Sequence, residues 1–373
     1  MRVRDKKEKL RCGIVGCGVI APSHAESYLV SSDVEFAWVC DSEKEKAVRL
    51  CADYAALNIC TDYKEMLQDE KLDCVSICTD HASHAHIASE FLSRGIDVLC
   101  EKPFAVSRSE ISLMKRAAKQ GNSILSGVLQ HRFDRDFILI KKLIADGCLG
   151  KILNASLDMR FSRPQSYYLR DEWRGKWKTE GGSALINQAI HFIDILDWIS
   201  GGIDSLCAVI DNLSHGSQIE TEDTASAVLS FKNGATGSVN VTSSSHLQWE
   251  PRISIAGTSG TAFLGEKGII SLRPDNESLA DSPVPEKHKD VNLKSAKDYY
   301  GSGHAAQISD FLGSVRTRRT PFVSAEDAGR AAEIIFTFYE SSRDRGWKKV
   351  TGEDGFADEG LGNTVRTRTC VVP

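Results

Sequence analysis

The sequence predicts an α/β protein, with a doubly wound parallel sheet first and an α+β domain with a mostly antiparallel sheet second. Two observations lead to this prediction. As far as residue 133, short apolar runs alternate with amphipathic stretches, which is typical of βαβ units whose strands are buried on both faces. After residue 133 the strand candidates are longer, alternate polar with apolar residues and are joined by short turns.

The elements of the first part follow one another as strand and helix, which indicates right-handed crossovers. The predicted strands are 11–18, 34–41, 72–79, 97–103 and 123–129. The predicted helices are 42–56, 84–95 and 109–121, with a further helix directly after the first strand.

The second part begins with two helices that flank a strand. The predicted helices are 134–146 and 183–200, the strand is 151–161, further strands lie in 224–244, 252–265 and 268–274, and the last helices are 302–319 and 324–346. Asn233-Gly234 marks a hairpin between two strands. We therefore expect domains at 1–133 and 134–352, followed by a polar, glycine-rich and flexible tail at 353–373.

Composition excludes several classes of protein. A chain of 373 residues is expected to form two domains. Its formal net charge is −5 and it has no basic stripe, so nucleic-acid binding is not expected. No apolar run reaches the roughly 18–20 residues of a membrane span, and the start lacks a secretory signal, so we expect a cytoplasmic protein. The 11 cysteines include no CxxC pair and are interpreted as reduced, mostly buried apolar groups.

A glycine-rich turn follows the first strand. In GIVGCGVIA, Gly16, Gly18 and Ala21 occupy the G-x-G-x-x-[G/A] positions between strand and helix. Gly16 permits the tight turn and Gly18 lets the backbone approach a pyrophosphate at the helix N-terminus, as in the Rossmann fold. Asp41 ends the second strand, where a carboxylate binds both ribose hydroxyls and repels a 2′-phosphate. NAD is therefore favoured over NADP, and a tight turn in some other doubly wound fold is the alternative.

Three histidines follow the strand at 72–79. His81, His84 and His86 have a spacing that resembles a metal site, but no nearby carboxylate or cysteine set completes it, so we predict no metal. Because this strand end faces the ligand edge of a parallel sheet, His84 is a candidate for lining the nicotinamide side. A surface or helix-start histidine is the alternative.

Glu101-Lys102-Pro103 ends the next strand, at the same edge. An extended chain directs Glu101 and Lys102 to opposite faces, so one can meet the cofactor and the other the substrate. Pro103 fixes the chain where it leaves the strand, and its peptide bond is a candidate for the cis form. A solvent-exposed lysine at the strand end is the alternative.

The segment EGGSALINQAIHFIDILD predicts an apolar helix that carries an amide and an imidazole on one side. Asn187 and His191 are four residues apart, so both side chains share one face of an α-helix. The pattern is explained if this face meets a substrate rather than the core. A buried histidine satisfied by the asparagine is the alternative.

In this order, GxGxxA, the second-strand Asp41, Glu101-Lys102-Pro103 and the glycine-led Asn-x-x-x-His helix resemble the glucose–fructose oxidoreductase/inositol dehydrogenase/MocA family, over roughly residues 10–350. The resemblance implies a Rossmann domain, then a large open-faced sheet domain, with the active site between them. It also implies a homodimer or homotetramer formed through the sheet face and a small carbohydrate or cyclitol substrate.

The resemblance also assigns roles. His191 is the expected general acid/base, Lys102 polarises the reacting oxygen, and Asn187 supports them. Where inositol dehydrogenases carry Asp, this chain has Asn187, which cannot accept a proton. This departure excludes a carboxylate-assisted relay and favours a sugar or nucleotide sugar as substrate. The residues expected to contact the cofactor are Gly16, Gly18, Val19, Ile20, Asp41, Thr79, His84, Glu101 and Lys102. The substrate candidates are Arg132, Arg163, Tyr167, Trp173, Arg174, Gln188 and His304.

Three functional hypotheses remain open at this point. The first is an NAD-linked dehydrogenase that exchanges its cofactor in each turnover. The second is a redox-neutral enzyme with trapped NAD, which oxidises a hydroxyl transiently for epimerisation, elimination or glycoside cleavage. The third is a non-catalytic nucleotide sensor, which the presence of both Lys102 and His191 disfavours.

Overall fold

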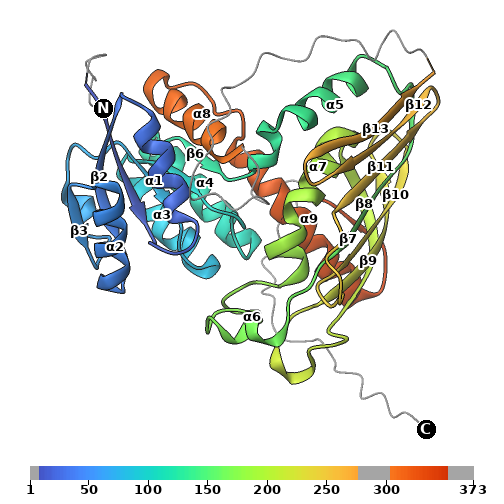
Figure 1. Cartoon of the computed structure of the whole chain (residues 1–373), viewed down its shortest axis with the longest axis horizontal. Helices are drawn as coiled ribbons and strands as arrows, with labels where there is room; N and C mark the ends of the chain where they lie inside the picture. Colours follow the sequence, from blue (N-terminus) through green and yellow to red (C-terminus); the bar gives the residue numbers. More distant parts are fainter. Residues whose placement is uncertain (1–7, 276–302, 352–373) are drawn as a thin grey trace.

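The computed structural model describes residues 8–275 and 303–351, so the tail predicted at 353–373 lies outside the described residues. Two sheets form the frame of the molecule, with helices α7 and α9 between them (Figure 1). Of the helices in these two ranges, none is long and apolar enough to cross a membrane.

The first sheet is parallel and six-stranded, in the order β3-β2-β1-β4-β5-β6. Its strands are β1 (Leu10–Val15), β2 (Val34–Cys40), β3 (Asn58–Cys60), β4 (Cys74–Ile77), β5 (Asp97–Cys100) and β6 (Leu125–Gly127). The associated helices are α1 (Ala21–Val30), α2 (Lys44–Tyr54), η1 (Met66–Gln68), η2 (His81–Ser83), α3 (His84–Ser93), α4 (Arg108–Gly121) and η3 (Gln130–Phe133). The strand order reverses direction between β1 and β4, which confirms the doubly wound prediction. Strand β3 was not predicted, because it is short and only Cys60 in it is buried.

The second sheet has eight strands, in the order β13-β12-β11-β7-β10-β9-β8-β14. These are β7 (Ile152–Arg160), β8 (Ile203–Asp211), β9 (Thr224–Phe231), β10 (Thr236–Thr242), β11 (Arg252–Gly257), β12 (Gly260–Gly265), β13 (Gly268–Pro274) and β14 (Lys348–Lys349). Strands β7 and β10 pair in parallel and the other neighbours are antiparallel, so the mostly antiparallel prediction is confirmed. Strand β8 was not predicted, because it follows the two glycines that end α7 without a separate turn signal.

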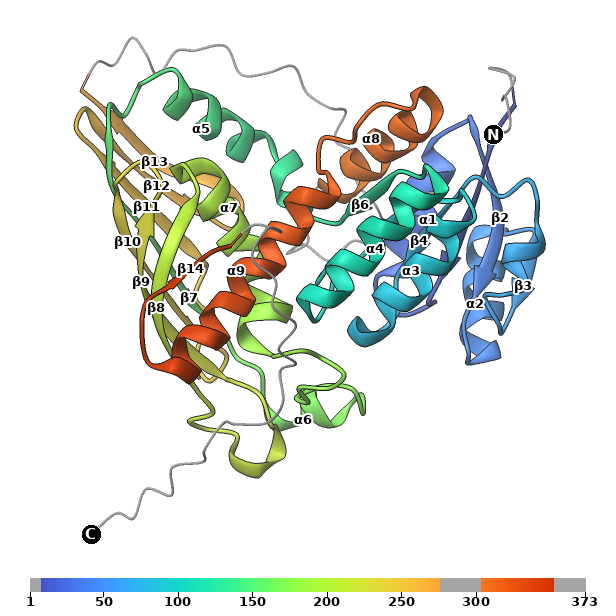
Figure 2. The same ribbon diagram turned by 180° about the vertical axis from the view of Figure 1, so that it is seen from behind.

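Helices cover one face of this second sheet. They include α7 (Ile190–Ser200) and α9 (Ala325–Asp344), while α5 (Arg135–Ala145), α6 (Gln165–Leu169), η4 (Ala184–Ala189) and η5 (Gly216–Gln218) complete the domain. The opposite face carries exposed apolar side chains, among them Val209, Val228 and Phe263. In the reverse view this face is turned away from the first sheet (Figure 2).

Helix α8 (Gly303–Thr317) returns to the first domain, beside α1 (Figure 1). Its Ile308 and Phe311 belong to the apolar cluster that contains Leu10 of β1. Gln307 accepts a hydrogen bond from Leu129 N at 3.0 Å and donates one to Gly127 O at 2.8 Å. The division expected at residue 133 therefore does not follow the packing, because the apolar face of α8 matches the first core rather than the second.

Candidate active site

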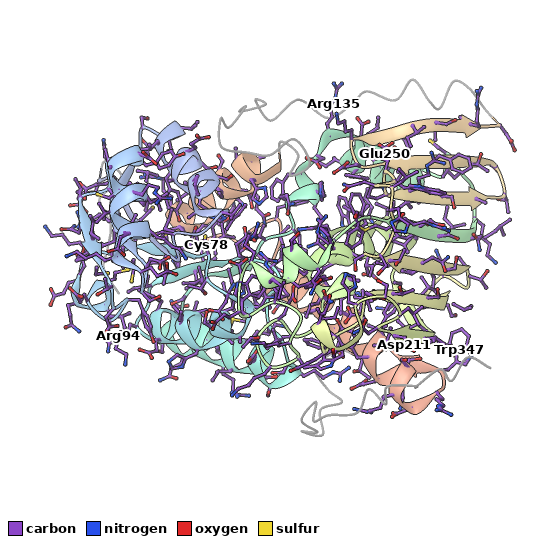
Figure 3. All side chains as sticks on the ribbon, turned by 60° about the horizontal axis from the view of Figure 1, so that its bottom comes forward. Cys78, Arg94, Arg135, Asp211, Glu250 and Trp347 are labelled. Atoms are coloured by element: carbon purple, nitrogen blue, oxygen red, sulfur yellow. The ribbon has the colours of Figure 1, made fainter. Side chains whose placement is uncertain are left out.

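The glycine-rich turn has the form that a dinucleotide requires. Gly16 has φ +92°, and a Cβ there would lie 2.6 Å from the carbonyl of Cys78, the residue that follows β4 (Figure 3). At Gly18 no atom lies within 4 Å of the position of a Cβ, so the chain is open to an approaching ligand. Asp41 accepts hydrogen bonds from Cys17 N at 2.7 Å and Glu43 N at 2.8 Å, which places its carboxylate beside the turn.

The start of α1 also suits a phosphate. Its first turn contains a proline, and no side chain caps its N-terminus. Val19 is 56 % exposed and Ile20 is partly buried, so this turn lies at the surface. These features fit a pyrophosphate bound by backbone N–H groups.

His84 does not face this space as expected. It is fully buried, with Nδ1 2.8 Å from Pro103 O and Nε2 3.2 Å from Thr79 O. The Lys102–Pro103 peptide bond is cis. His84 therefore joins the ends of β4 and β5 and positions the Lys102 loop, which corrects the expectation that its ring lines the nicotinamide. Thr79 stands at the strand end, as expected, with a partly buried hydroxyl that accepts a hydrogen bond from Ser83 at 2.7 Å.

Glu101 lies beneath α1 and α8, and its Oε2 accepts a hydrogen bond from Lys102 N at 3.0 Å. Its Oε1 lies 3.0 Å from His24 Nε2 and 3.6 Å from His304 Nε2, and His24 Nδ1 lies 2.9 Å from Ser76 Oγ. Although burial alone would raise the pKa of Glu101, the hydrogen bonds from His24 and His304 hold it well below its usual range. The structure thus places Glu101 and His304 in one buried cluster, which corrects their expected contacts with cofactor and substrate. His24 gave no sequence signal, because one histidine in a helix has no pattern.

Lys102 crosses from the first domain to the second. Its Nζ donates to Asn187 O and to Asn187 Oδ1, both at 2.8 Å. Burial lowers the pKa of Lys102 to about 8, a shift that Glu101 opposes and Arg174 reinforces. The lysine and the amide predicted from separate motifs are therefore in direct contact.

A buried carboxylate lies behind Asn187. Asn187 Nδ2 donates to Glu180 Oε1 and lies 3.4 Å from the Tyr167 hydroxyl, and the second oxygen of Glu180 accepts from Gly175 N. Burial raises the pKa of Glu180, which is fully enclosed. Sequence reasoning missed this residue, because a single glutamate before two glycines has no distinguishing pattern. The expectation that Asn187 removes every carboxylate from the relay is thus wrong in one respect: Glu180 lies one hydrogen bond further away.

The helix that carries Asn187 and His191 does not begin as predicted. Residues Ala184–Ala189 form a π-helical turn, and α-helix starts at Ile190. The face shared at four-residue spacing was calculated for a regular α-helix, so it does not apply to this turn. Such wide turns often occur at functional sites. Asn187 meets Lys102 and Glu180, while His191 packs edge-on to His131, with ring centroids 5.5 Å apart.

His191 is the side chain best prepared to accept a proton. Its Nδ1 is buried and has no hydrogen-bond partner among the described residues. Burial, followed by the charge of Lys102, holds the pKa of His191 well below its usual range. A neutral imidazole at neutral pH is the form that acts as a base.

Most of the substrate candidates gather around the Tyr167 hydroxyl, on the short helix α6. Arg174 Nη1 and Gln188 Nε2 donate to it, the latter at 3.1 Å, and Arg163 Nη2 donates to Gln188 Oε1 at 2.7 Å. The Arg174 guanidinium lies 4.4 Å from the Tyr167 ring centroid and 4.3 Å from that of Trp173. The structure thus joins these five candidates to Asn187 and Lys102 in one hydrogen-bonded and stacked cluster.

Arg132 does not belong to this cluster. It is buried and makes two hydrogen bonds to Asp194, at 2.9 and 2.7 Å, and one to Asp327 at 2.7 Å. Its guanidinium also lies 5.4 Å from the ring of Trp198. The arginine joins η3, α7 and α9, so its expected substrate contact is corrected to an internal ion pair.

The histidines near 81–86 serve separate purposes. His81 Nδ1 donates to Glu180 O at 2.9 Å and its ring packs against Trp173, so His81 supports the site from the first domain. The side chain of His86 is 71 % exposed and pairs with Glu90. In residues 8–275 and 303–351, no group of three or more His, Cys, Asp or Glu residues is arranged to hold a metal ion.

Comparisons with known proteins agree with this architecture. Residues 10–127 match the model described as "Oxidoreductase family, NAD-binding Rossmann fold", and residues 141–350 match "Oxidoreductase family, C-terminal alpha/beta domain". The chain is 23% identical to myo-inositol 2-dehydrogenase of Thermotoga maritima, over 87% of this chain and 94% of that protein. It is 25% identical to levoglucosan dehydrogenase of Pseudarthrobacter phenanthrenivorans, over 64% of this chain and 69% of that protein.

Among solved structures, the WlbA dehydrogenase of Bordetella pertussis in complex with NADH and UDP-GlcNAcA superposes with a TM-score of 0.82. That chain is 28% identical, and the match covers 93% of this chain and 99% of the other. Levoglucosan dehydrogenase in complex with NADH and levoglucosan has a TM-score of 0.79 at 20% identity, which shows a shared fold.

Proposed function

The chain belongs to the glucose–fructose oxidoreductase/inositol dehydrogenase/MocA oxidoreductase family, whose first domain binds NAD, and from that membership we propose a specific activity. We propose that it transfers hydride between nicotinamide and a ring carbon of a sugar, nucleotide sugar or cyclitol, interconverting a hydroxyl and a ketone. The observation that carries this proposal is the contact of Lys102, at the ligand edge of the parallel sheet, with Asn187, together with a neutral His191 whose pKa is lowered in part by the charge of Lys102.

The residues present fit NAD. The backbone of Gly16 to Ile20 would hold the pyrophosphate, and the open side of Gly18 leaves room for it. Asp41, already anchored to the turn through Cys17 N, would accept hydrogen bonds from the adenosine ribose and disfavour NADP. When bound, NAD supplies the hydride acceptor or donor.

The side chains of this chain would handle the proton and the charge. His191, uncharged because of its burial, takes the hydroxyl proton in the oxidative direction and returns it in the reductive direction. Lys102 in its protonated form stabilises negative charge on the reacting oxygen. Asn187 fixes the Lys102 ammonium through two acceptors, so the amide orients the lysine rather than accepting a proton.

Relatives support the substrate class. Myo-inositol 2-dehydrogenase and levoglucosan dehydrogenase are named for cyclitol and sugar oxidation, and WlbA was crystallised with a nucleotide sugar. All three names describe ring-shaped polyhydroxylated compounds. The polar and aromatic cluster of Tyr167, Trp173 and Gln188 matches the hydroxyls and apolar faces of such rings.

The experiment is a spectroscopic titration of purified protein with NAD and a panel of cyclitols, sugars and UDP-sugars. We expect a reduced-nicotinamide absorbance band that grows far beyond the enzyme concentration and disappears in Lys102→Ala. The control is Lys71→Ala, which removes an exposed lysine outside the cluster.

A band that stops at about one per active site would instead identify the redox-neutral enzyme with trapped NAD. The catalytic proposal would be refuted if the protein binds NAD but shows no reduced-nicotinamide band, and if Lys102→Ala leaves this absorbance unchanged.

A further inference from the structure

The site described above carries more positive charge than its own carboxylates balance. Lys102 donates only to Asn187, and Arg163 to Gln188 and Ser162, so neither forms an ion pair with a carboxylate in the described ranges. Arg174 pairs with Asp171, but Arg170 shares that carboxylate. Three cations thus surround the site, and in the described ranges only Arg174 among them forms a direct ion pair with a carboxylate.

The other titratable groups nearby offset this charge only in part. Burial lowers the pKa of His81, with the Lys102 charge as a second cause, so this ring is neutral, like His191. Burial raises the pKa of Glu180, whose two oxygens accept from Asn187 and Gly175 and form no direct ion pair with the three cations in the described ranges. Glu101 contacts His24 and His304 rather than the two arginines, although its charge also raises the pKa of Lys102.

Both guanidinium groups are held in place by aromatic rings, and only that of Arg174 also contacts an internal anion. Arg163 lies 5.1 Å from the ring centroid of Phe161 and 5.1 Å from that of Tyr167, and its Nε is buried without a hydrogen-bond partner among the described residues. Arg174 is clamped between Tyr167 and Trp173. Fixing and partly desolvating like charges costs free energy, which an arriving oxyanion would recover through charge-assisted hydrogen bonds.

We propose that the substrate of this site is an anionic sugar, whose carboxylate or phosphate group is bound by Arg163 and Arg174. The anionic group would lie on the reacting sugar unit itself, because the chain of contacts from Lys102 through Asn187 and Tyr167 to Arg174 is short. The planar fork of arginine matches either oxyanion with two parallel hydrogen bonds. This inference rests on the proposed function, since it concerns the same site.

The test compares matched ligands. NAD-loaded protein is titrated calorimetrically with glucuronate, galacturonate and mannuronate, with the three neutral parent sugars, and with their 6-phosphates. We expect at least one anionic sugar to bind about tenfold or more tightly than its neutral parent, with a preference that weakens as salt is added. A preference shown by uronates alone identifies a carboxylate, and one shown by phosphates alone identifies a phosphate.

Variants then locate the preference. Arg163→Gln and Arg174→Gln should each reduce the anionic-to-neutral affinity ratio to about threefold or less, whereas Arg163→Lys should keep part of it. Gln188→Glu should also abolish it, because the new carboxylate would pair with Arg163 while both arginines remain. Arg94→Gln is the control for net charge, since Arg94 is exposed on the outer surface of the first domain (Figure 3). Unchanged NAD affinity shows that each variant is folded.

Equal affinity for anionic and neutral sugars in the wild type would overturn the inference, as would a preference that survives in both glutamine variants. The proposed function fails separately. Turnover of neutral sugars that is lost in Lys102→Ala would uphold the oxidoreductase while refuting the anion site. Tight, arginine-dependent binding of anionic sugars that never reduce NAD would uphold the anion site while refuting the oxidoreductase.

Discussion

The contact between Asn187 and Glu180 leads to a prediction in which two harmful substitutions compensate each other. Glu180 is acceptor-only: one oxygen takes the Asn187 amide hydrogen and the other takes Gly175 N–H. This arrangement forces Asn187 to present Oδ1, an acceptor, to the Lys102 ammonium at 2.8 Å. The carboxylate of Glu180 therefore sets the orientation of an amide that in turn positions the lysine.

In Glu180→Gln, the new NH₂ group must meet either Asn187 Nδ2 or Gly175 N–H, and both are donors. Either Asn187 turns its NH₂ toward the Lys102 ammonium, or a buried donor is left without a partner. A buried donor without its hydrogen-bond partner costs about 1–3 kcal/mol. If the misplaced amide displaces Lys102, the same cost in the transition state corresponds to a decrease of about 5- to 150-fold in kcat/KM. Asn187→Asp alone is harmful for a different reason, because two buried carboxylates would then face each other.

The double variant Glu180→Gln/Asn187→Asp restores every contact. The introduced aspartate would accept from Lys102 with one oxygen and from the NH₂ group of the introduced glutamine with the other, while the glutamine Oε1 would accept from Gly175 N–H. We expect the double variant to recover at least tenfold in kcat/KM over the worse single variant, a coupling within the usual range of about 0.5–3 kcal/mol. Steady-state kinetics with the substrate found in the panel, together with NAD affinity as the folding control, measure this. Additive losses in the double variant would refute the orientation argument.

Four further outcomes are expected. Because burial lowers the pKa of Lys102 to about 8, kcat/KM should fall about tenfold per pH unit above that value as the ammonium is lost, and a profile flat to pH 10 would contradict a charged lysine. Asp41→Ala should reduce the preference for NAD over NADP by about tenfold or more, measured as the ratio of kcat/KM values. Arg132→Met should lower the free energy of unfolding in urea by about 3–5 kcal/mol, because it leaves Asp194 buried without its cation, whereas the same change at exposed Arg135 should have little effect. If the open sheet face forms an oligomer, Val228→Asp should reduce the mass measured by light scattering, and an unchanged mass would place the interface elsewhere.

The fold was predictable from local patterns because the strands of both sheets have clear periods. Continuous apolar runs identified β1, β2, β4, β5 and β6, and alternation identified most of the second sheet. The predictions failed where an element has no separate boundary signal or where its apolar pattern fits either domain. Strand β8 follows a helix across two glycines, and α8 has an apolar face that looks the same whichever core it joins. Sequence period specifies that a face is buried, but not against which partner.

The site divides along similar lines. Gly16, Asp41 and Lys102 could be singled out because each occurs where topology restricts the reason for the residue, whereas Asn187 was singled out by its spacing from His191, and their functional roles stay predictions. Arg132 was misassigned, because an arginine after a strand end looks the same whether it awaits a ligand or neutralises Asp194 from a distant helix. The partner of a buried charge is set by tertiary contacts, which spacing along the chain does not report.

Glu180 shows why a single departure from a family pattern should not be interpreted in isolation. Replacing an aspartate with Asn187 changes the residue next to Lys102 from an anion into a dipole, and considered alone this removes the negative charge. In the folded chain the dipole is oriented by a carboxylate on its other side, so Lys102 still meets an acceptor and still lies within the field of Glu180, which raises its pKa. The negative charge lies one hydrogen bond further from Lys102 than an aspartate at position 187 would place it. The positive charge of Lys102 is therefore compensated less than it would be in a direct ion pair. The same deficit underlies the proposed preference for an anionic sugar, so the contact of Lys102 with Asn187 and that proposal have one electrostatic origin.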